Sequence, residues 1–178
     1  MAEFNIAFQK MLHHEGGYSN DPDDLGKETY KGISRAHNKN WSGWSRIDKY
    51  KGKFDFPSIL DKDDRLQNEV EEFYRTNFWI PLNANQISNQ TIANSIFDFG
   101  VNAGITTSVR LIQSIIGTKA DGIIGEQTVK RLNSIDSSYV QTAFTVVKME
   151  YYIHIIKQRP TNKKYLYGWI IRALEFNE

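Results

Sequence analysis

The feature that most constrains this chain is a short amphipathic segment that ends in a pair of glycines. Its apolar residues recur at spacings of three and four, as on one helix face: Phe4, Ala7, Phe8, Met11 and Leu12. We expect a helix over residues 3–14 that ends at Gly16-Gly17, because glycine takes the positive-φ conformation that closes many helices. Glu15 then lies between an apolar helix face and a turn.

A glutamate in that position is a candidate catalytic acid. Burial beside apolar side chains disfavours the charged carboxylate and raises its pKa. Three aspartates follow within nine positions: Asp21, Asp23 and Asp24. A protonated carboxyl group facing a second carboxylate is the arrangement that cleaves glycosidic bonds. Turn formation also explains each aspartate taken singly, since aspartate is common beside proline and glycine in loops.

Composition narrows the function further. A chain of 178 residues suits one domain, or one domain with a small annex. The net charge of +1 argues against a nucleic-acid-binding protein, which usually carries a basic stripe. The absence of cysteine excludes disulfides, thiolate metal sites and a cysteine nucleophile. His13 and His14 are adjacent and point about 100° apart on a helix, so we expect no metal site and no cofactor.

The sequence predicts a mostly α architecture with a small β-hairpin region after the first helix. Turn-rich residues 18–36 form that region, and residues 37–60 are expected to be a loop with a short helix. The remaining helices are expected from Asp61 to Pro81 and over residues 89–103, 106–116, 126–134, 139–158 and 163–175. Ser137-Ser138 is the expected cap of the longest. A change in character near residues 86–90 suggests two regions, 1–88 and 89–178.

Several motifs, in order, resemble those of glycoside hydrolase family 108, the N-acetylmuramidases with a Glu-Gly-Gly-Tyr motif. The first is Glu15-Gly16-Gly17-Tyr18, followed by Asn20-Asp21-Pro22, Asp24, Gly26, Thr29 and Gly32-Ile33-Ser34. The later ones are Tyr74 to Leu82, Phe97 to Gly104 and Tyr167 to Arg172. Residues 109–132 resemble the peptidoglycan-binding module usual in this family. Together the motifs cover nearly the whole chain.

The resemblance implies a lysozyme-like fold and cleavage of the β-1,4 bond between N-acetylmuramic acid and N-acetylglucosamine. Glu15 matches the catalytic glutamate and becomes the general acid. Asp24 and Thr29 lie near the places where phage-type lysozymes hold an aspartate and a threonine around the attacking water; Asp21 is the second choice for that carboxylate. Five residues are expected to contact peptidoglycan glycan strands, the implied partner: Tyr18, Asn20, Asp21, Tyr30 and Asn102.

Members of this family occur as phage endolysins and as muramidases that assist secretion. The N-terminus has no basic stretch followed by an apolar run, so no Sec signal peptide is expected. No window of 18 apolar residues predicts a membrane span. We therefore expect synthesis in the cytoplasm and action on the cell wall or periplasm after holin-type or other non-Sec release.

A rival interpretation keeps the fold without the catalysis. Leu25 and Lys27 stand where the family usually has proline and glycine, and residues 38–58 match the family poorly. A non-catalytic peptidoglycan-binding or secretion-helper protein would tolerate those changes. A third possibility is a purely structural helical protein, which would bind no wall at all.

Overall fold

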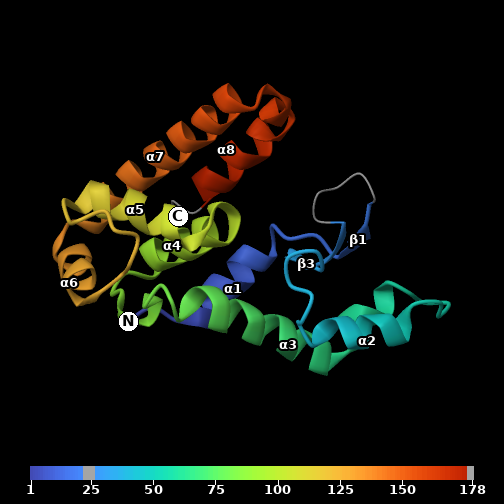
Figure 1. Ribbon diagram of the computed structural model, residues 1–178. Coiled ribbons are helices and arrows are strands. Elements are labelled where there is room, and N and C mark those ends of the chain that lie inside the picture. Colours follow the sequence, from blue (N-terminus) through green and yellow to red (C-terminus); the bar gives the residue numbers. More distant parts are fainter. Residues whose placement is uncertain (22–26, 176–178) are drawn as a thin grey trace. The chain divides into compact units, whose positions relative to one another are not determined.

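The computed structural model describes residues 1–21 and 27–175 (Figure 1). Within these residues the chain is mostly helical with one small three-stranded antiparallel sheet, so the fold class expected from the sequence is confirmed. The chain forms two compact units, which we call the sheet unit (Gln9–Arg75) and the helical unit (Met1–Phe8 with Thr76–Glu178). No helix in the described ranges is both long and apolar enough to cross a bilayer.

The sheet unit contains the end of the first helix, three short strands and two further helices. Its elements are α1 (Phe4–Leu12, shared with the helical unit), β1 (Tyr18–Asn20), β2 (Glu28–Tyr30), β3 (Ile33–Ser34), α2 (Gly43–Tyr50), a 3-10 turn (Ser58–Lys62) and α3 (Asp64–Tyr74). Asp63 begins α3, because its Oδ1 accepts hydrogen bonds from the backbone N–H groups of Arg65 and Leu66 at 3.0 and 3.1 Å. The acidic helix opening expected there is confirmed.

The strand order in the sheet is β1-β2-β3, with β2 in the centre. Ser19 pairs with Thr29, and Thr29 pairs with Ser34. Because residues directly opposite each other in antiparallel strands share a face, these three hydroxyl side chains form one row across the sheet. Tyr18 and Tyr30 form the next row, on the other face.

The helical unit is built around the nearly wholly buried α4. A π-helical turn (Arg75–Trp79) leads into it, and its elements are a 3-10 turn (Ala84–Gln86), α4 (Gln90–Ala103), α5 (Ile105–Ile116), α6 (Glu126–Ser134), α7 (Ser137–Gln158), a 3-10 turn (Pro160–Tyr165) and α8 (Leu166–Glu175). Figure 1 shows α7 and α8 as an antiparallel pair. The Phe99 ring of α4 packs edge-to-face against the rings of Phe144 and Tyr152 of α7, each at a centroid distance of 5.8 Å. These contacts hold α4 against α7.

Two local expectations are wrong in their mechanism. Gly16 and Gly17 do not take positive φ. The first helix instead closes with tight turn bonds, from the His14 N–H to Met11 O at 3.0 Å and from the Glu15 N–H to Leu12 O at 3.1 Å. The cap of α7 is Asp136, which accepts from the Tyr139 N–H at 2.8 Å, and not the serine pair that follows it. Ser137 and Ser138 already belong to the helix, so the residue before them supplies the cap, and an acidic residue is favourable at a helix N-terminus.

A buried ionic group joins α4, α7 and α8. The Arg172 guanidinium donates to both Asp98 carboxylate oxygens at 2.8 to 3.1 Å, and the Asp98 side chain is only 6% exposed. Lys148 is 2% exposed, and its Nζ donates to Ser95 Oγ at 2.9 Å and to Ala173 O at 3.3 Å. Burial lowers the pKa of Lys148 to about 8, against an opposing contribution from Asp98.

The Lys148→Met variant should lose an alkaline rise in stability. The pKa of Lys148 falls from 10.5 to about 8 on folding, so between those pH values the unfolded chain binds more protons and the wild type gains stability as pH rises. The gain, about 3 kcal/mol in the free energy of unfolding, is absent with methionine. Urea unfolding of both proteins from pH 7 to 10.5 measures it. Parallel stability curves for the two proteins would contradict the assignment.

Candidate active site

Glu15 is half-buried in the sheet unit, just after α1. Its carboxylate approaches Gly32 closely: a methyl group on the Gly32 α carbon would lie 2.5 Å from Glu15 Oε2. The same methyl group would lie 2.6 Å from the Tyr74 hydroxyl oxygen. Glu15 and Tyr74 therefore present their oxygens to one small space above Gly32, which a side chain at that position would fill.

The backbone holds this arrangement from two sides. The Lys31 N–H donates to Gly17 O at 3.2 Å, which ties the segment after Glu15 to the turn between β2 and β3. The Tyr74 hydroxyl, at the end of α3, donates to Lys31 O at 2.7 Å. Gly32 itself has φ of +79°, a conformation that glycine adopts without steric cost. The position of the carboxylate is therefore set by three separate segments.

Tyr18 lies within reach of the protein surface and is partly fixed. Its ring meets Phe56 edge-on at a centroid distance of 4.7 Å, and its hydroxyl donates to Glu28 Oε1 at 3.1 Å. Burial, reinforced by the hydrogen bond to the Glu28 carboxylate, raises the pKa of Tyr18. The side chain is half-buried, so one part of it is open to a ligand.

Tyr30 lies in the interior instead. It is 1% exposed, its hydroxyl donates to Asp61 Oδ1 at 3.2 Å, and it accepts from Gln67 Nε2 at 2.9 Å. Burial raises the pKa of this hydroxyl. These contacts anchor β2 to α3 and favour a supporting role for Tyr30 over the direct sugar contact expected from the sequence.

Thr29 and the polar residues after β1 are more open. Thr29 is half-buried at the centre of the hydroxyl row, while Asn20 and Asp21 are exposed. Asn20 lines a pocket of about 610 Å3 in the sheet unit, together with Lys27, Glu28, Arg35, Ala36 and Lys39. Asp24, the first choice for the second carboxylate, lies outside the described residues, as does Asp23.

Ion pairs stiffen the back of that pocket. Arg35 Nε lies 2.8 Å from Glu28 Oε2, and Lys51 Nζ lies 2.8 Å from Glu28 Oε1. Arg35 also pairs with Asp48 at 2.7 Å, and this hydrogen bond lowers the pKa of Asp48. Lys27 and Lys39 also line the pocket, so its lining carries three cationic side chains and one carboxylate. Such a lining attracts a ligand that carries carboxylates.

Comparison with known proteins identifies the chain. Residues 8–104 match the family model described as glycosyl hydrolase 108, and residues 107–174 match a model described as a predicted peptidoglycan domain. The chain belongs to glycosyl hydrolase family 108. The family motif begins with Glu15, the carboxylate that the structure places above Gly32. Family membership makes this a lysozyme-like fold of a glycoside hydrolase family, and the second match supports peptidoglycan as a partner of the C-terminal part.

A solved structure supports the fold of this family 108 member. The structure of Brucella abortus SagA superposes with a TM-score of 0.71, covering 98% of this chain and 91% of that chain at 20% sequence identity. At that identity the likeness speaks for the fold alone. No curated protein sequence matches the chain. The first family model ends at Gly104 and the second begins at Thr107. The boundaries between the two compact units lie elsewhere, between Phe8 and Gln9 and between Arg75 and Thr76. The sequence alone suggests a boundary after residue 88.

The remaining expected site residue belongs to the helical unit. Asn102 lies near the end of α4, is exposed, and donates from Nδ2 to the Tyr152 hydroxyl at 2.9 Å. Tyr152 stacks on Trp169 of α8 at a centroid distance of 5.0 Å. Among residues 1–21 and 27–175, no three His, Asp or Glu side chains gather as a cation site would require.

Gly32 and Tyr74 are the site residues that sequence reasoning missed. In the sequence both residues stand out only as members of motifs, Gly32 in Gly32-Ile33-Ser34 and Tyr74 in the segment from Tyr74 to Leu82. The available signal was the glycine inside the motif Gly32-Ile33-Ser34, because a glycine between short strands often marks close approach of another group. The approaching group, the Glu15 carboxylate, becomes visible only in three dimensions.

Gly32→Ala should damage both stability and activity. The positive φ costs a non-glycine residue about 1–2 kcal/mol, and the new methyl group must displace the Glu15 carboxylate or the Tyr74 hydroxyl. We expect a lower midpoint in urea unfolding and at least a tenfold loss of wall hydrolysis. Gly168→Ala in α8 is the matched control, because a methyl group added there would meet no neighbouring side chain or segment within 4 Å. Its midpoint in urea unfolding should be no lower than that of the wild type. If the two variants had the same unfolding midpoint and the same activity, the close approach of Glu15 and Tyr74 to Gly32 would be refuted.

Proposed function

We propose that this family 108 protein is an N-acetylmuramidase that hydrolyses the β-1,4 bond between N-acetylmuramic acid and N-acetylglucosamine, with Glu15 as general acid. The observation that carries the proposal is the placement of the Glu15 carboxylate, half-buried above Gly32 and beside the Tyr74 hydroxyl. A carboxyl group held in one place by the surrounding backbone is positioned to donate a proton to a glycosidic oxygen bound beside it.

In the proposed mechanism Glu15 donates its proton to the leaving oxygen as the bond to the anomeric carbon breaks. A second carboxylate activates water or stabilises the positive charge that develops on the sugar ring. We assign that role to Asp24 first and to Asp21 second. Thr29 is proposed to hold the water through its hydroxyl, on the face that it shares with Ser19 and Ser34.

The cationic pocket supports a wall polymer as the substrate. Its lining of Lys27, Arg35 and Lys39 against Glu28 complements carboxylates, which peptidoglycan carries on its stem peptides. Asn20 at the same pocket and the half-buried Tyr18 supply amide and hydroxyl groups for the sugar. Because this substrate lies in the wall, we place the site of action there.

Analysis of reducing ends in digested wall tests the proposal. Purified sacculi are incubated with the protein, reduced with borohydride and hydrolysed, and the reduced sugar is identified. Reduced N-acetylmuramic acid is expected. Reduced N-acetylglucosamine would contradict the assigned bond by indicating a glucosaminidase.

A non-catalytic wall-binding protein is the second candidate, favoured by the match of residues 107–174 to a peptidoglycan domain. It predicts no new reducing ends together with co-sedimentation on sacculi. That combination would refute the muramidase proposal.

A further inference from the structure

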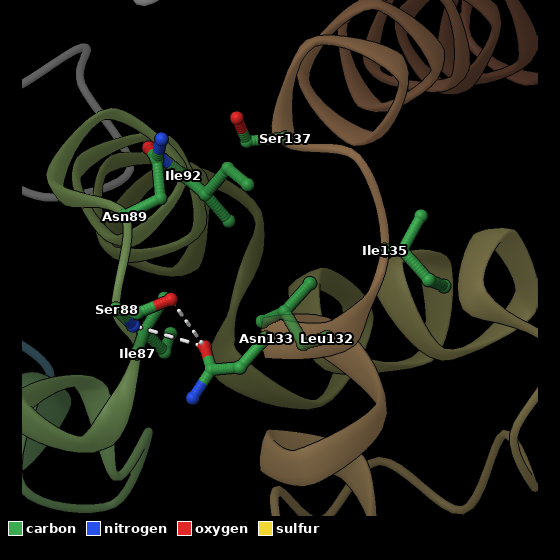
Figure 2. Close-up of a pocket in the computed structure, with 8 residues that line it drawn as sticks. All are labelled: Ile87, Ser88, Asn89, Ile92, Leu132, Asn133, Ile135 and Ser137. Carbon is green, nitrogen blue, oxygen red and sulfur yellow. Dashed lines mark hydrogen bonds between the residues drawn. The ribbon is translucent and has the colours of Figure 1, made fainter.

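A groove with uncharged walls lies in the helical unit, where the beginnings of α4 and α7 approach the end of α6 (Figure 2). One part of it is a pocket of about 270 Å3 lined by Ile87, Ser88, Asn89, Ile92, Leu132, Asn133, Ile135 and Ser137. A hollow of about 430 Å3 shares Asn89 and Ser137 with it and adds Thr91, Ser138, Gln141 and Thr142. We call the two together the α4–α7 groove.

The groove combines an apolar floor with hydrogen-bonding walls. Ile87, Ile92 and Leu132 are at most 3% exposed and form the floor. The walls carry hydroxyl and carboxamide groups, and none of the described residues that line the groove has a charged side chain. Burying a charged ligand group there without an ionic partner would be costly. The groove therefore suits a neutral ligand with both polar and methyl surfaces.

The walls are fixed before any ligand arrives. Asn133 Oδ1 accepts from the Ser88 N–H at 2.9 Å and from Ser88 Oγ at 3.1 Å, which joins the two sides of the pocket (Figure 2). Asn133 Nδ2 donates to Gln86 O at 2.9 Å. Asn89 Oδ1 is held by its cap bond to the Ile92 N–H at 3.0 Å, so the side-chain amide nitrogen of Asn89 has a defined position. A preformed site binds with little ordering cost.

We infer that the α4–α7 groove binds an uncharged N-acetylated sugar unit of a glycan strand, as a second contact apart from the catalytic residues. An acetamido group offers one methyl to the apolar part of the lining, where Ile135 is partly exposed, and one carbonyl to the side-chain amide nitrogen of Asn89. Sugar hydroxyls match the serine and threonine walls. A 270 Å3 pocket, near the lower end of the usual range of roughly 300–1,000 Å3, suits one sugar ring. The inference rests on the proposed function, which makes glycan the substrate.

Titration with tri-N-acetylchitotriose, followed by backbone amide NMR, tests the groove. This probe has acetamido groups but no peptide and no carboxylate. The full-length Glu15→Gln protein is used so that the probe is not consumed. Saturable shifts are expected at residues 87–92 and 132–142.

Two variants make the test specific to the groove. Asn89→Asp keeps the helix cap, since aspartate and asparagine cap equally well, but it replaces the amide donor with a charge. It should bind the sugar at least tenfold more weakly. Ser134→Asp adds the same charge at an exposed neighbour outside the groove lining and should bind like the parent.

Absence of sugar-induced shifts in the groove, or equal affinity of the Asn89→Asp and Ser134→Asp variants, would overturn the inference. Groove shifts caused by a stem tetrapeptide in place of the sugar would also overturn it. These results are independent of wall hydrolysis. If the wild type cleaves sacculi but the groove shows no sugar-induced shifts, only the groove inference is refuted. If the sugar binds in the groove but the wild type cleaves no sacculi, only the muramidase proposal is refuted.

Discussion

Replacing Glu15 with glutamine is expected to lower the rate of wall hydrolysis by about 10²–10⁴-fold, the usual contribution of a general acid. Glutamine fills the same space above Gly32 beside the Tyr74 hydroxyl, so the fold is retained. Its amide holds no transferable proton, so the leaving oxygen must depart unprotonated. Turbidity loss of purified sacculi at matched protein concentration measures the effect.

Glu126→Gln is the matched control for that loss. Glu126 is an exposed glutamate in the first turn of α6, outside the site. It should clear sacculi at the wild-type rate, which shows that loss of one carboxylate elsewhere does not matter. Wild-type clearing by the Glu15→Gln variant would remove Glu15 from the mechanism.

Asp98→Asn is expected to cause the largest loss of stability, about 3–5 kcal/mol in the free energy of unfolding. The substitution keeps the shape of the side chain but leaves the Arg172 guanidinium without its carboxylate partner and removes the favourable charge interaction of Asp98 with Lys148. Lys148 is buried and the Arg172 side chain is only 14% exposed, so water compensates poorly for the lost charge. Guanidinium chloride unfolding at pH 7, followed by circular dichroism, measures the change.

A surface ion pair provides the comparison. Glu71 in α3 pairs at 2.7 Å with Arg75, the residue that follows α3, and each side chain is 37% exposed. Glu71→Gln should cost less than about 0.5 kcal/mol, because solvent screens an exposed pair. If the two substitutions cost the same, the group around Asp98 is not buried in solution as it is in the structure.

Helices with strong apolar periodicity could be predicted from the sequence. The prediction for α6 agrees at both ends, and α4 and α5 differ by one residue at one end. Their ends are marked by local chemistry that a sequence displays. Asn89 caps α4, and Gly117 closes α5 in the left-handed conformation with φ of +71°.

The features that the sequence concealed depend on contacts between distant segments. Nothing local indicates that Tyr74 reaches the turn after β2, 43 residues earlier, or that Tyr30 is buried by bonds to Asp61 and Gln67. The sequence predicts that Tyr30 contacts the glycan, but tertiary packing places its ring inside the protein. The sequence did predict that Glu15 follows the first helix, since that placement depends only on the helix and the turn after it.

The most direct test of the account compares wild type and Glu15→Gln on two glycosides. One is the native glycan, whose leaving oxygen needs a proton, and the other is an aryl glycoside of the same sugar whose acidic phenol leaves without one. The account predicts a loss of about 10²–10⁴-fold on the glycan and nearly full activity on the aryl glycoside. Equal losses on both substrates would show that Glu15 does not act by donating a proton.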